Sequence, residues 1–106
     1  MQDAIEAFDR GVDHLRNSEF EHAVEAFTEA IELDSELAVA YNGRGAVYAL
    51  IGDTDQGIAD CNEAIRLAPK EARFYRARGL IYRDLGEEAK AEADLAKSEE
   101  LGFTPE

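Results

Sequence analysis

The sequence predicts an all-α fold in which six antiparallel helices form a solenoid. The first observation is a 34-residue period, shown most clearly by Gly11, Gly45 and Gly79. The second is that each period contains two segments whose apolar residues recur at helical spacing. The third is that turn-forming residues separate these segments. A period of this length with two helical segments is typical of helix–turn–helix repeat arrays.

The six helical segments follow one another with short connections. They are residues 4–16, 20–33, 38–50, 54–67, 72–85 and 88–101. The two helices of each pair are separated by residues typical of turns and helix C-caps, which are Asn17-Ser18, Gly52-Asp53 and Gly86. Pro69 interrupts the chain between the second and third pairs, because proline cannot continue a helix.

Small and aromatic residues keep the same period as the glycines. The repeated sets are Ala7, Tyr41 and Tyr75; His14, Tyr48 and Tyr82; Ala23, Gly57 and Ala91; Phe27, Cys61 and Leu95; and Ala30, Ala64 and Ser98. Glycine inside a helix costs about 1 kcal/mol relative to alanine. This cost is understandable if a neighbouring helix approaches closely at each recurring glycine.

The middle period resembles the tetratricopeptide repeat (TPR) family. The matching residues are Tyr41, Gly45, Tyr48, Gly57, Ala64 and Pro69. The resemblance extends over unit one (residues 4–37), unit two (38–71) and unit three (72–101), with a C-terminal cap and tail at residues 102–106. The departures are Ala7, His14, Ser35 and Phe103, which replace an aromatic residue, a tyrosine and two prolines. The resemblance implies one right-handed solenoid domain, residues 1–106, that acts as a protein–protein interaction module and not as an enzyme.

Composition excludes several classes of partner. The net charge is −13, from 24 acidic and 11 basic residues, so neither nucleic acid nor an anionic membrane is expected to bind. The apolar runs are too short to cross a membrane, and the acidic N-terminus does not resemble a secretory signal. The single cysteine, Cys61, is expected to be buried, and it is typical of a reducing compartment. We therefore expect a cytoplasmic protein.

Unit three is expected to end the array. Glu92 and Glu99 replace residues that are apolar in units one and two, and burying these glutamates under a further unit would be costly. Gly102 is expected to follow the last helix in a capping conformation, and Phe103 is expected to fold back onto the last helical turn.

In the TPR family the first helices of successive units line a concave groove that binds partner segments. The resemblance therefore implies peptide-binding residues at Ile5, Phe8, Val12, Val39, Asn42, Ala46, Arg73, Arg76, Leu80 and Arg83. The same surface includes Asp9, Arg16, Gly43, Leu50 and Ala77. Arg73, Arg76 and Arg83 share one helix face, and guanidinium groups bind carboxylates bidentately. An acidic peptide or a C-terminal carboxylate is thus the expected partner, and the alternative is that these arginines pair with neighbouring acidic side chains.

One group within the family binds the C-terminal carboxylate of heat-shock chaperones through lysine, asparagine and arginine side chains. The corresponding positions of this chain hold Phe8, Val12, Gly43, Arg73 and Ala77, so only Arg73 keeps the charge. Chaperone tails are not expected to bind in that manner. A ligand with an apolar part near Phe8 and Val12 and an acidic part near Arg73 fits the sequence better.

No arrangement of residues predicts catalysis, a metal site or a cofactor. His14, His22 and Cys61 lack a metal-ligand spacing, and no glycine-rich phosphate loop is present. The alternative function is structural, namely a homo-oligomer in which the apolar N-terminal groove around Phe8 is buried against a second copy.

Overall fold

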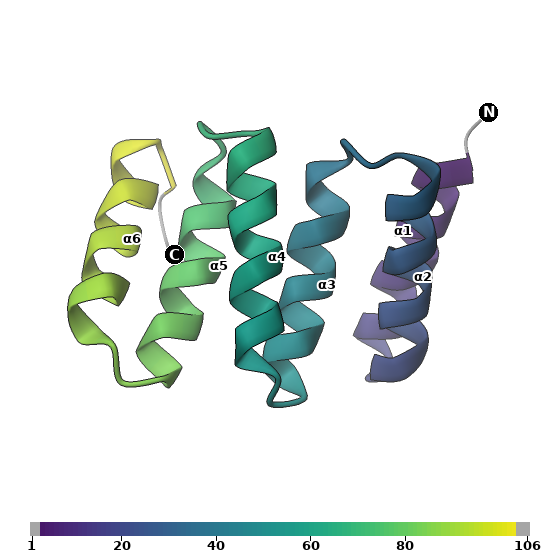
Figure 1. Cartoon of the computed structure of the whole chain (residues 1–106), viewed down its shortest axis with the longest axis horizontal. Coiled ribbons are helices and arrows are strands. Elements are labelled where there is room, and N and C mark those ends of the chain that lie inside the picture. The colour runs from purple at the N-terminus through teal and green to yellow at the C-terminus, as the bar shows by residue number, and fades with distance from the viewer. Residues whose placement is uncertain (1–2, 104–106) are drawn as a thin grey trace.

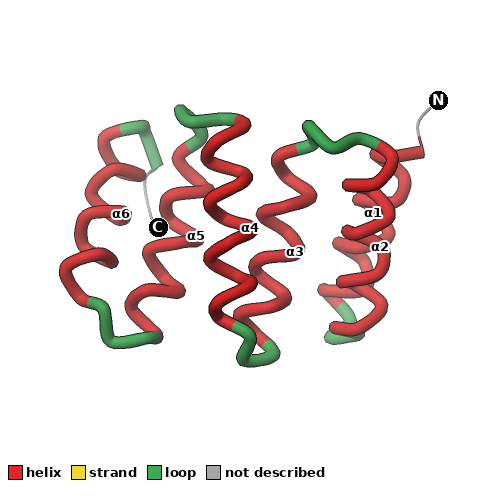
Figure 2. The backbone as a smooth tube through the Cα atoms, viewed as in Figure 1, coloured by secondary structure: helices red, strands yellow, loops and turns green. Residues whose placement is uncertain are grey.

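The computed structural model describes residues 3–103, and its helices follow the predicted segments closely (Figures 1 and 2). They are α1 (Asp3–Arg16), α2 (Phe20–Leu33), α3 (Ala38–Leu50), α4 (Thr54–Leu67), α5 (Ala72–Asp84) and α6 (Glu88–Glu100). Each helix begins and ends within one residue of its predicted bounds. Between residues 3 and 103 there is no strand. The prediction of an all-α fold with six helices is confirmed.

The helices form three antiparallel pairs that follow one another along the long axis of the molecule (Figure 1). The molecule measures 39 × 26 × 25 Å. α2 packs against α3 and α4 packs against α5, so each pair contacts the next. The first helices, α1, α3 and α5, also contact one another in sequence. They therefore form a continuous row along one face of the solenoid.

Small residues allow the helices of units two and three to approach closely. A Cβ atom at Gly45 would lie 2.9 Å from the carbonyl oxygen of Gly57. A Cβ atom at Gly79 would lie 3.1 Å from the Cβ atom of Asp94. A side chain at Gly45 would require the backbone to shift, and one at Gly79 would have to displace its neighbours slightly. The close approach expected from the recurring glycines is confirmed.

Unit one fills the corresponding region with the ring of Phe27 from α2. Phe27 is fully buried and forms a core cluster with Val47 of α3. Cβ atoms at Gly11 of α1 and Gly43 of α3 would lie 2.6 Å and 2.8 Å from the Phe27 ring. The ring centroid of Phe8 lies 5.6 Å from that of Phe27. A single aromatic side chain therefore joins α1, α2 and α3.

The three turns within the units share one backbone conformation. Ser18, Gly52 and Gly86 follow the C-caps of α1, α3 and α5 with φ values of 60°, 92° and 80°. Glycine adopts this left-handed conformation without steric cost, whereas other residues do not. At Ser18 the turn is closed by the N–H of Glu19, which donates to the carbonyl oxygen of His14 at 2.8 Å. This conformation is therefore strained at Ser18, whereas Gly52 and Gly86 adopt it without strain.

The C-terminal end of α6 is capped as predicted. Gly102 has a φ of 109°, and the N–H of Phe103 donates to the carbonyl oxygen of Ser98 at 2.9 Å. This pattern is a Schellman cap. Glu92 and Glu99 are exposed, as expected for the outer surface of the last helix.

Cys61 is fully buried, as its place in the repeat predicts. Burial raises the pKa of its thiol to about 12, because the interior disfavours the thiolate. The thiol is therefore neutral at physiological pH, and its role is packing.

Candidate functional site

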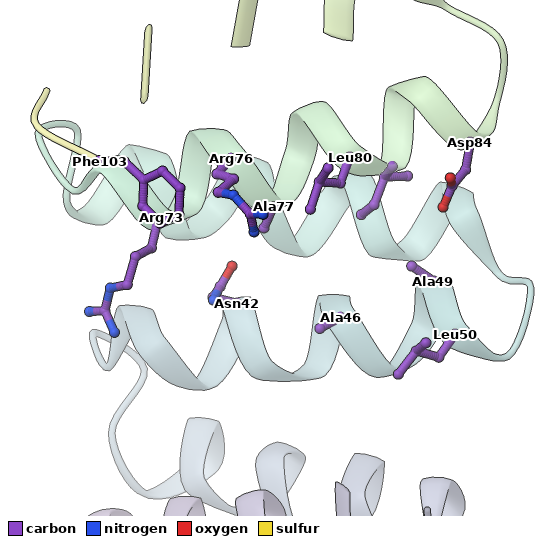
Figure 3. A pocket seen from close by; sticks show the side chains of 11 residues that line it. Asn42, Ala46, Ala49, Leu50, Arg73, Arg76, Ala77, Leu80, Asp84 and Phe103 are labelled. Atoms are coloured by element: carbon purple, nitrogen blue, oxygen red, sulfur yellow. The ribbon is translucent and has the colours of Figure 1, made fainter. Parts of the chain in front are cut away.

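A groove with a volume of about 500 Å³ lies between α3 and α5 (Figure 3). Its lining residues are Asn42, Ala46, Ala49, Leu50, Arg73, Arg76, Ala77, Leu80, Ile81, Asp84 and Phe103. The residues from α3 and from α5 recur at helical spacing, so one face of each helix supplies them. The groove thus lies on the row of first helices, where the sequence predicts a binding surface.

The middle of the groove is apolar. Ala46 and Ala49 of α3 lie across from Ala77 and Leu80 of α5 (Figure 3). Three of these four residues are alanines, whose short side chains leave the space between the helices open. Leu50, which is 62% exposed, adds an apolar side chain at the edge. This part of the groove suits short apolar side chains.

Two arginines of α5 lie at one end of the groove (Figure 3). The Cζ atom of Arg76 lies 4.7 Å from the ring centroid of Phe103, which is a cation–π contact. Arg73 donates from Nε to Glu71 at 3.0 Å, and this hydrogen bond lowers the pKa of Glu71. Among residues 3–103, no acidic side chain forms an ion pair with Arg76. Positive charge therefore remains available at this end.

Asn42 of α3 presents an unpaired acceptor beside the arginines (Figure 3). Its Oδ1 atom is buried and accepts no hydrogen bond from any residue in the described part of the chain. A buried acceptor without a partner costs about 1–3 kcal/mol. An N–H donor from a bound molecule would remove this cost.

The opposite end of the groove carries an acidic residue. Asp84 occupies the last position of α5, one helical turn beyond Leu80 (Figure 3). It is exposed to solvent. The groove therefore has a basic end, an apolar middle and an acidic end.

Half of the residues predicted to bind a peptide line this groove. These are Asn42, Ala46, Arg73, Arg76 and Leu80. Arg83 lines a second, smaller hollow of about 180 Å³ between α5 and α6, together with Arg76 and Phe103. The remaining four predicted residues, Ile5, Phe8, Val12 and Val39, do not line the groove between α3 and α5.

In the N-terminal part of the predicted groove, two side chains contribute to core packing. Phe8 and Val12 are half-buried against the cluster around Phe27. Ile5 is 44% exposed and is the only large exposed apolar residue in the described part of α1. Phe8 and Val12 therefore pack partly against the core cluster around Phe27, and an apolar subsite at these residues stays a prediction. The same packing does not favour self-association through this surface.

Four lining residues were not predicted from the sequence, namely Ala49, Ile81, Asp84 and Phe103. Asp84 follows Leu80 by four residues on the same helix, so extending the helical spacing would have found it. Phe103 reaches the groove because the chain reverses after α6 and places the ring over Arg76 of α5. It was expected to pack on the last turn of α6, and no local spacing indicates the longer reach.

A different set of arginines is structural. Arg44 donates through Nε and Nη2 to both carboxylate oxygens of Asp60 at 2.9 Å, and Arg78 does the same to Asp94 at 2.8 Å. Each arginine also donates to a side chain of the preceding unit. The two networks are Thr28–Arg44–Asp60 and Asn62–Arg78–Asp94. The hydrogen bonds to aspartate raise the pKa of both guanidinium groups.

These contacts distinguish the structural arginine of unit three from the three that were predicted to bind a ligand. Arg78 is neutralised by Asp94 and is only partly exposed, so it serves the fold. Arg73 pairs with Glu71 in an exposed contact, which is weak. Of the three arginines predicted to bind a ligand, only Arg73 pairs with an acidic side chain within residues 3–103, whereas Arg76 and Arg83 form no ion pair there.

The structure explains one departure from the chaperone-binding pattern. Gly43 lies against the Phe27 ring, and a Cβ atom there would be 2.8 Å from Phe27 Cζ. An asparagine at this position would collide with the ring. Phe27 therefore excludes a polar side chain at position 43, where the chaperone-binding proteins of the family have one.

Other polar side chains do not assemble a reactive site. The ring centroids of His14 and His22 lie 5.2 Å apart, although the two residues belong to different helices. The Nδ1 atom of His14 lies 2.8 Å from Oε1 of Glu19. Within residues 3–103, no three histidine, cysteine or acidic side chains are grouped to hold a metal ion. None of the helices in this range is long and apolar enough to cross a membrane.

Comparisons with known sequences identify the repeat. A family model described as Tetratricopeptide repeat matches residues 8–72 and 51–102. The human small glutamine-rich tetratricopeptide repeat-containing protein beta is 38% identical over 53 residues. That match covers 50% of this chain and 17% of the length of the human protein.

Solved TPR domains share the fold. The TPR2B domain of yeast Sti1, solved as a complex with pHsp70, is 31% identical with a TM-score of 0.91, over 95% of this chain and 81% of that chain. The second TPR domain of Spaghetti (RPAP3), bound to the HSP90 peptide SRMEEVD, is 28% identical with a TM-score of 0.89. This match covers 94% of this chain and 93% of that domain. The Arabidopsis OM64 TPR domain is 25% identical with a TM-score of 0.92, over 95% and 84%.

Proposed function

Because this chain belongs to the tetratricopeptide repeat family, we propose that it is a protein–protein interaction module that binds a peptide segment in the groove between α3 and α5. The observation that carries the proposal is the groove itself, which is open, apolar in its middle and basic at one end. Two similar domains, from Sti1 and RPAP3, were solved in complexes with pHsp70 and with an HSP90 peptide. We assign the chain no catalytic step.

Different residues of the groove contact different parts of the proposed peptide. Arg73 and Arg76 attract a carboxylate, either from an acidic side chain or from a C-terminus, because guanidinium groups form paired hydrogen bonds with it. Asn42 Oδ1 accepts a backbone N–H of the peptide, which satisfies the buried acceptor. The alanines and Leu80 bury the apolar side chains of the ligand. Affinity in the micromolar range is expected for an interface of this small size.

The proposed ligand is acidic, but the binding mode differs from the chaperone-tail clamp. Phe8, Val12 and Gly43 supply no polar side chain, and Phe27 prevents one at position 43. The acidic part of the ligand therefore depends on α5 and not on α1. Binding of an acidic peptide is expected to be independent of Phe8 and Val12.

The test compares an acidic and a neutral peptide of the same apolar sequence by fluorescence anisotropy. The double substitution Arg73→Glu with Arg76→Glu should lower the affinity for the acidic peptide at least tenfold, since loss of a hydrogen-bonded charge pair costs more than about 1.4 kcal/mol. The affinity for the neutral peptide should change by less than about twofold. A matched control, Arg66→Glu with Lys90→Glu, changes the net charge equally at exposed sites outside the groove. Equal loss in both double variants would contradict the proposal.

A further inference from the structure

The groove between α3 and α5 has charges of opposite sign at its two ends. Arg73 and Arg76 lie at one end and Asp84 lies at the other, with Ala77 and Leu80 between them on the same helix (Figure 3). A groove that recognised only a carboxylate would not require an acid at its far end. The arrangement is complementary to a ligand that itself carries two opposite charges.

The spacing of these charges matches a short extended peptide. Arg76 and Asp84 are eight residues apart on α5, which at 1.5 Å per residue places them about 12 Å apart along the helix axis. An extended chain covers about 3.3 Å per residue. Two ligand side chains separated by about four residues therefore reach both ends together. The apolar middle of the groove faces the residues between them.

Asp84 is not explained by the stability of its own helix. It ends α5, where a negative charge interacts unfavourably with the helix dipole. The corresponding positions of units one and two are Arg16 and Leu50, so the acid occurs only in unit three. Between residues 3 and 103 no lysine, arginine or histidine forms an ion pair with Asp84. A cation supplied by a ligand would pair with Asp84 and would also offset the unfavourable interaction of its charge with the helix dipole.

We propose that the groove selects peptides by charge order, with a carboxylate at Arg73 and Arg76, apolar residues in the middle, and a basic residue about four positions away at Asp84. This inference rests on the proposed peptide-binding function and adds the basic residue, the spacing and the role of Asp84. The unpaired Oδ1 atom of Asn42 fixes the register, because it binds one backbone N–H near the carboxylate end.

The experiment uses blocked peptides, so that the termini carry no charge. Glu-Leu-Val-Leu-Lys and Lys-Leu-Val-Leu-Glu test both chain directions, and each has a partner in which glutamine replaces lysine. A further peptide supplies the acid as a free C-terminal carboxylate, which distinguishes the two sources of that charge. Each peptide is titrated by calorimetry against the wild type, Asp84→Asn and Asp84→Lys. Glu92→Gln on the exposed face of α6 is the control for loss of one negative charge.

For at least one chain direction, lysine should improve the affinity of the wild type about threefold to fivefold over glutamine, as expected for an exposed ion pair. Asp84→Asn should abolish this preference while Glu92→Gln retains it. Asp84→Lys should reverse it, so that the glutamine peptide binds better than the lysine peptide. Asp84 is exposed, so the variants should keep the wild-type helical circular dichroism.

Equal binding of the lysine and glutamine peptides to the wild type would overturn the charge-order proposal and leave the acidic-peptide function standing. Failure of every peptide, including those with glutamine, would overturn both. Reduced binding of all peptides to Asp84→Asn, with no change in the lysine preference, would also contradict the assigned role of Asp84.

Discussion

Unit one and the two following units hold their helix pairs together by different means. In units two and three, an arginine on the first helix forms a bidentate pair with an aspartate on the second, and these are Arg44–Asp60 and Arg78–Asp94. In unit one, the arginine is Arg10, but the aspartate position is Ala26. Arg10 instead forms an exposed pair with Glu29 at 2.7 Å, with both side chains about half exposed.

Unit one compensates with aromatic packing. The ring of Phe27 fills the space between α1 and α3, where Cys61 is the counterpart in unit two. The backbone spacing is set by the recurring small residues, which all three units share. The repeat therefore fixes where the helices meet, whereas the interaction that joins them can be an ion pair or an aromatic ring.

The largest expected effect comes from breaking the partly buried ion pair Arg44–Asp60, compared with breaking the exposed pair Arg10–Glu29. Asp60→Ala should lower the free energy of unfolding by about 3 kcal/mol, because it leaves the half-buried guanidinium of Arg44 without its partner. Glu29→Ala is the matched control in unit one and should cost less than about 1 kcal/mol. Urea denaturation measures both. Similar losses in the two variants would remove the distinction between the units.

The second prediction concerns the position shared by Phe27 and Cys61. The folded thiol keeps its proton up to a pKa of about 12, whereas the unfolded thiol loses it near pH 9. Ionisation above pH 9 therefore stabilises the unfolded chain, and the contribution of Cys61 to stability is present below that pH and lost as the pH rises. When the pH rises from 7 to 10.5, the free energy of unfolding of the wild type should fall by about 2 kcal/mol more than that of Cys61→Ala.

Urea denaturation at the two pH values provides the measurement for Cys61. Both proteins contain the same other ionisable residues, so the effect of those residues cancels in the difference. Parallel losses in the wild type and Cys61→Ala would show that the buried thiol is not linked to stability.

The smallest expected effect concerns the turn that unit one makes without glycine. Ser18→Gly should raise the free energy of unfolding by about 0.5 kcal/mol, since relief of the left-handed conformation exceeds the added entropy of the unfolded chain. Gly52→Ser, the reverse change in unit two, should lower stability by a similar or larger amount. Thermal unfolding of both variants gives the sign. Destabilisation by Ser18→Gly would mean that the serine side chain stabilises this turn.

The two arginine–aspartate pairs follow the 34-residue period of the sequence, but the sequence alone does not show that the residues pair. Arg44 and Arg78, and Asp60 and Asp94, are each 34 residues apart. The partners within a pair are 16 residues apart and belong to different helices, so helical spacing does not connect them. Only the antiparallel packing of α3 on α4 and of α5 on α6 brings them together.

The candidate site was predicted in part for a related reason. Asn42, Ala46, Arg73, Arg76 and Leu80 were found because residues on one face of a helix can be counted from spacing alone. Spacing did not indicate that Phe8 and Val12 are half-buried, since their exposure depends on Phe27 from another helix. A helix face can thus be read from the chain, but its exposure depends on which neighbour covers it.

The sequence by itself determined the repeat, the bounds of six helices and the cap at Gly102, because these features depend on contacts between residues close in the chain. The tertiary structure decided that the groove lies between α3 and α5, that Phe103 covers Arg76 and that Asn42 is left without a partner. These features depend on the distances between helices. Such distances are set by the volumes of side chains that meet only after the units have packed together.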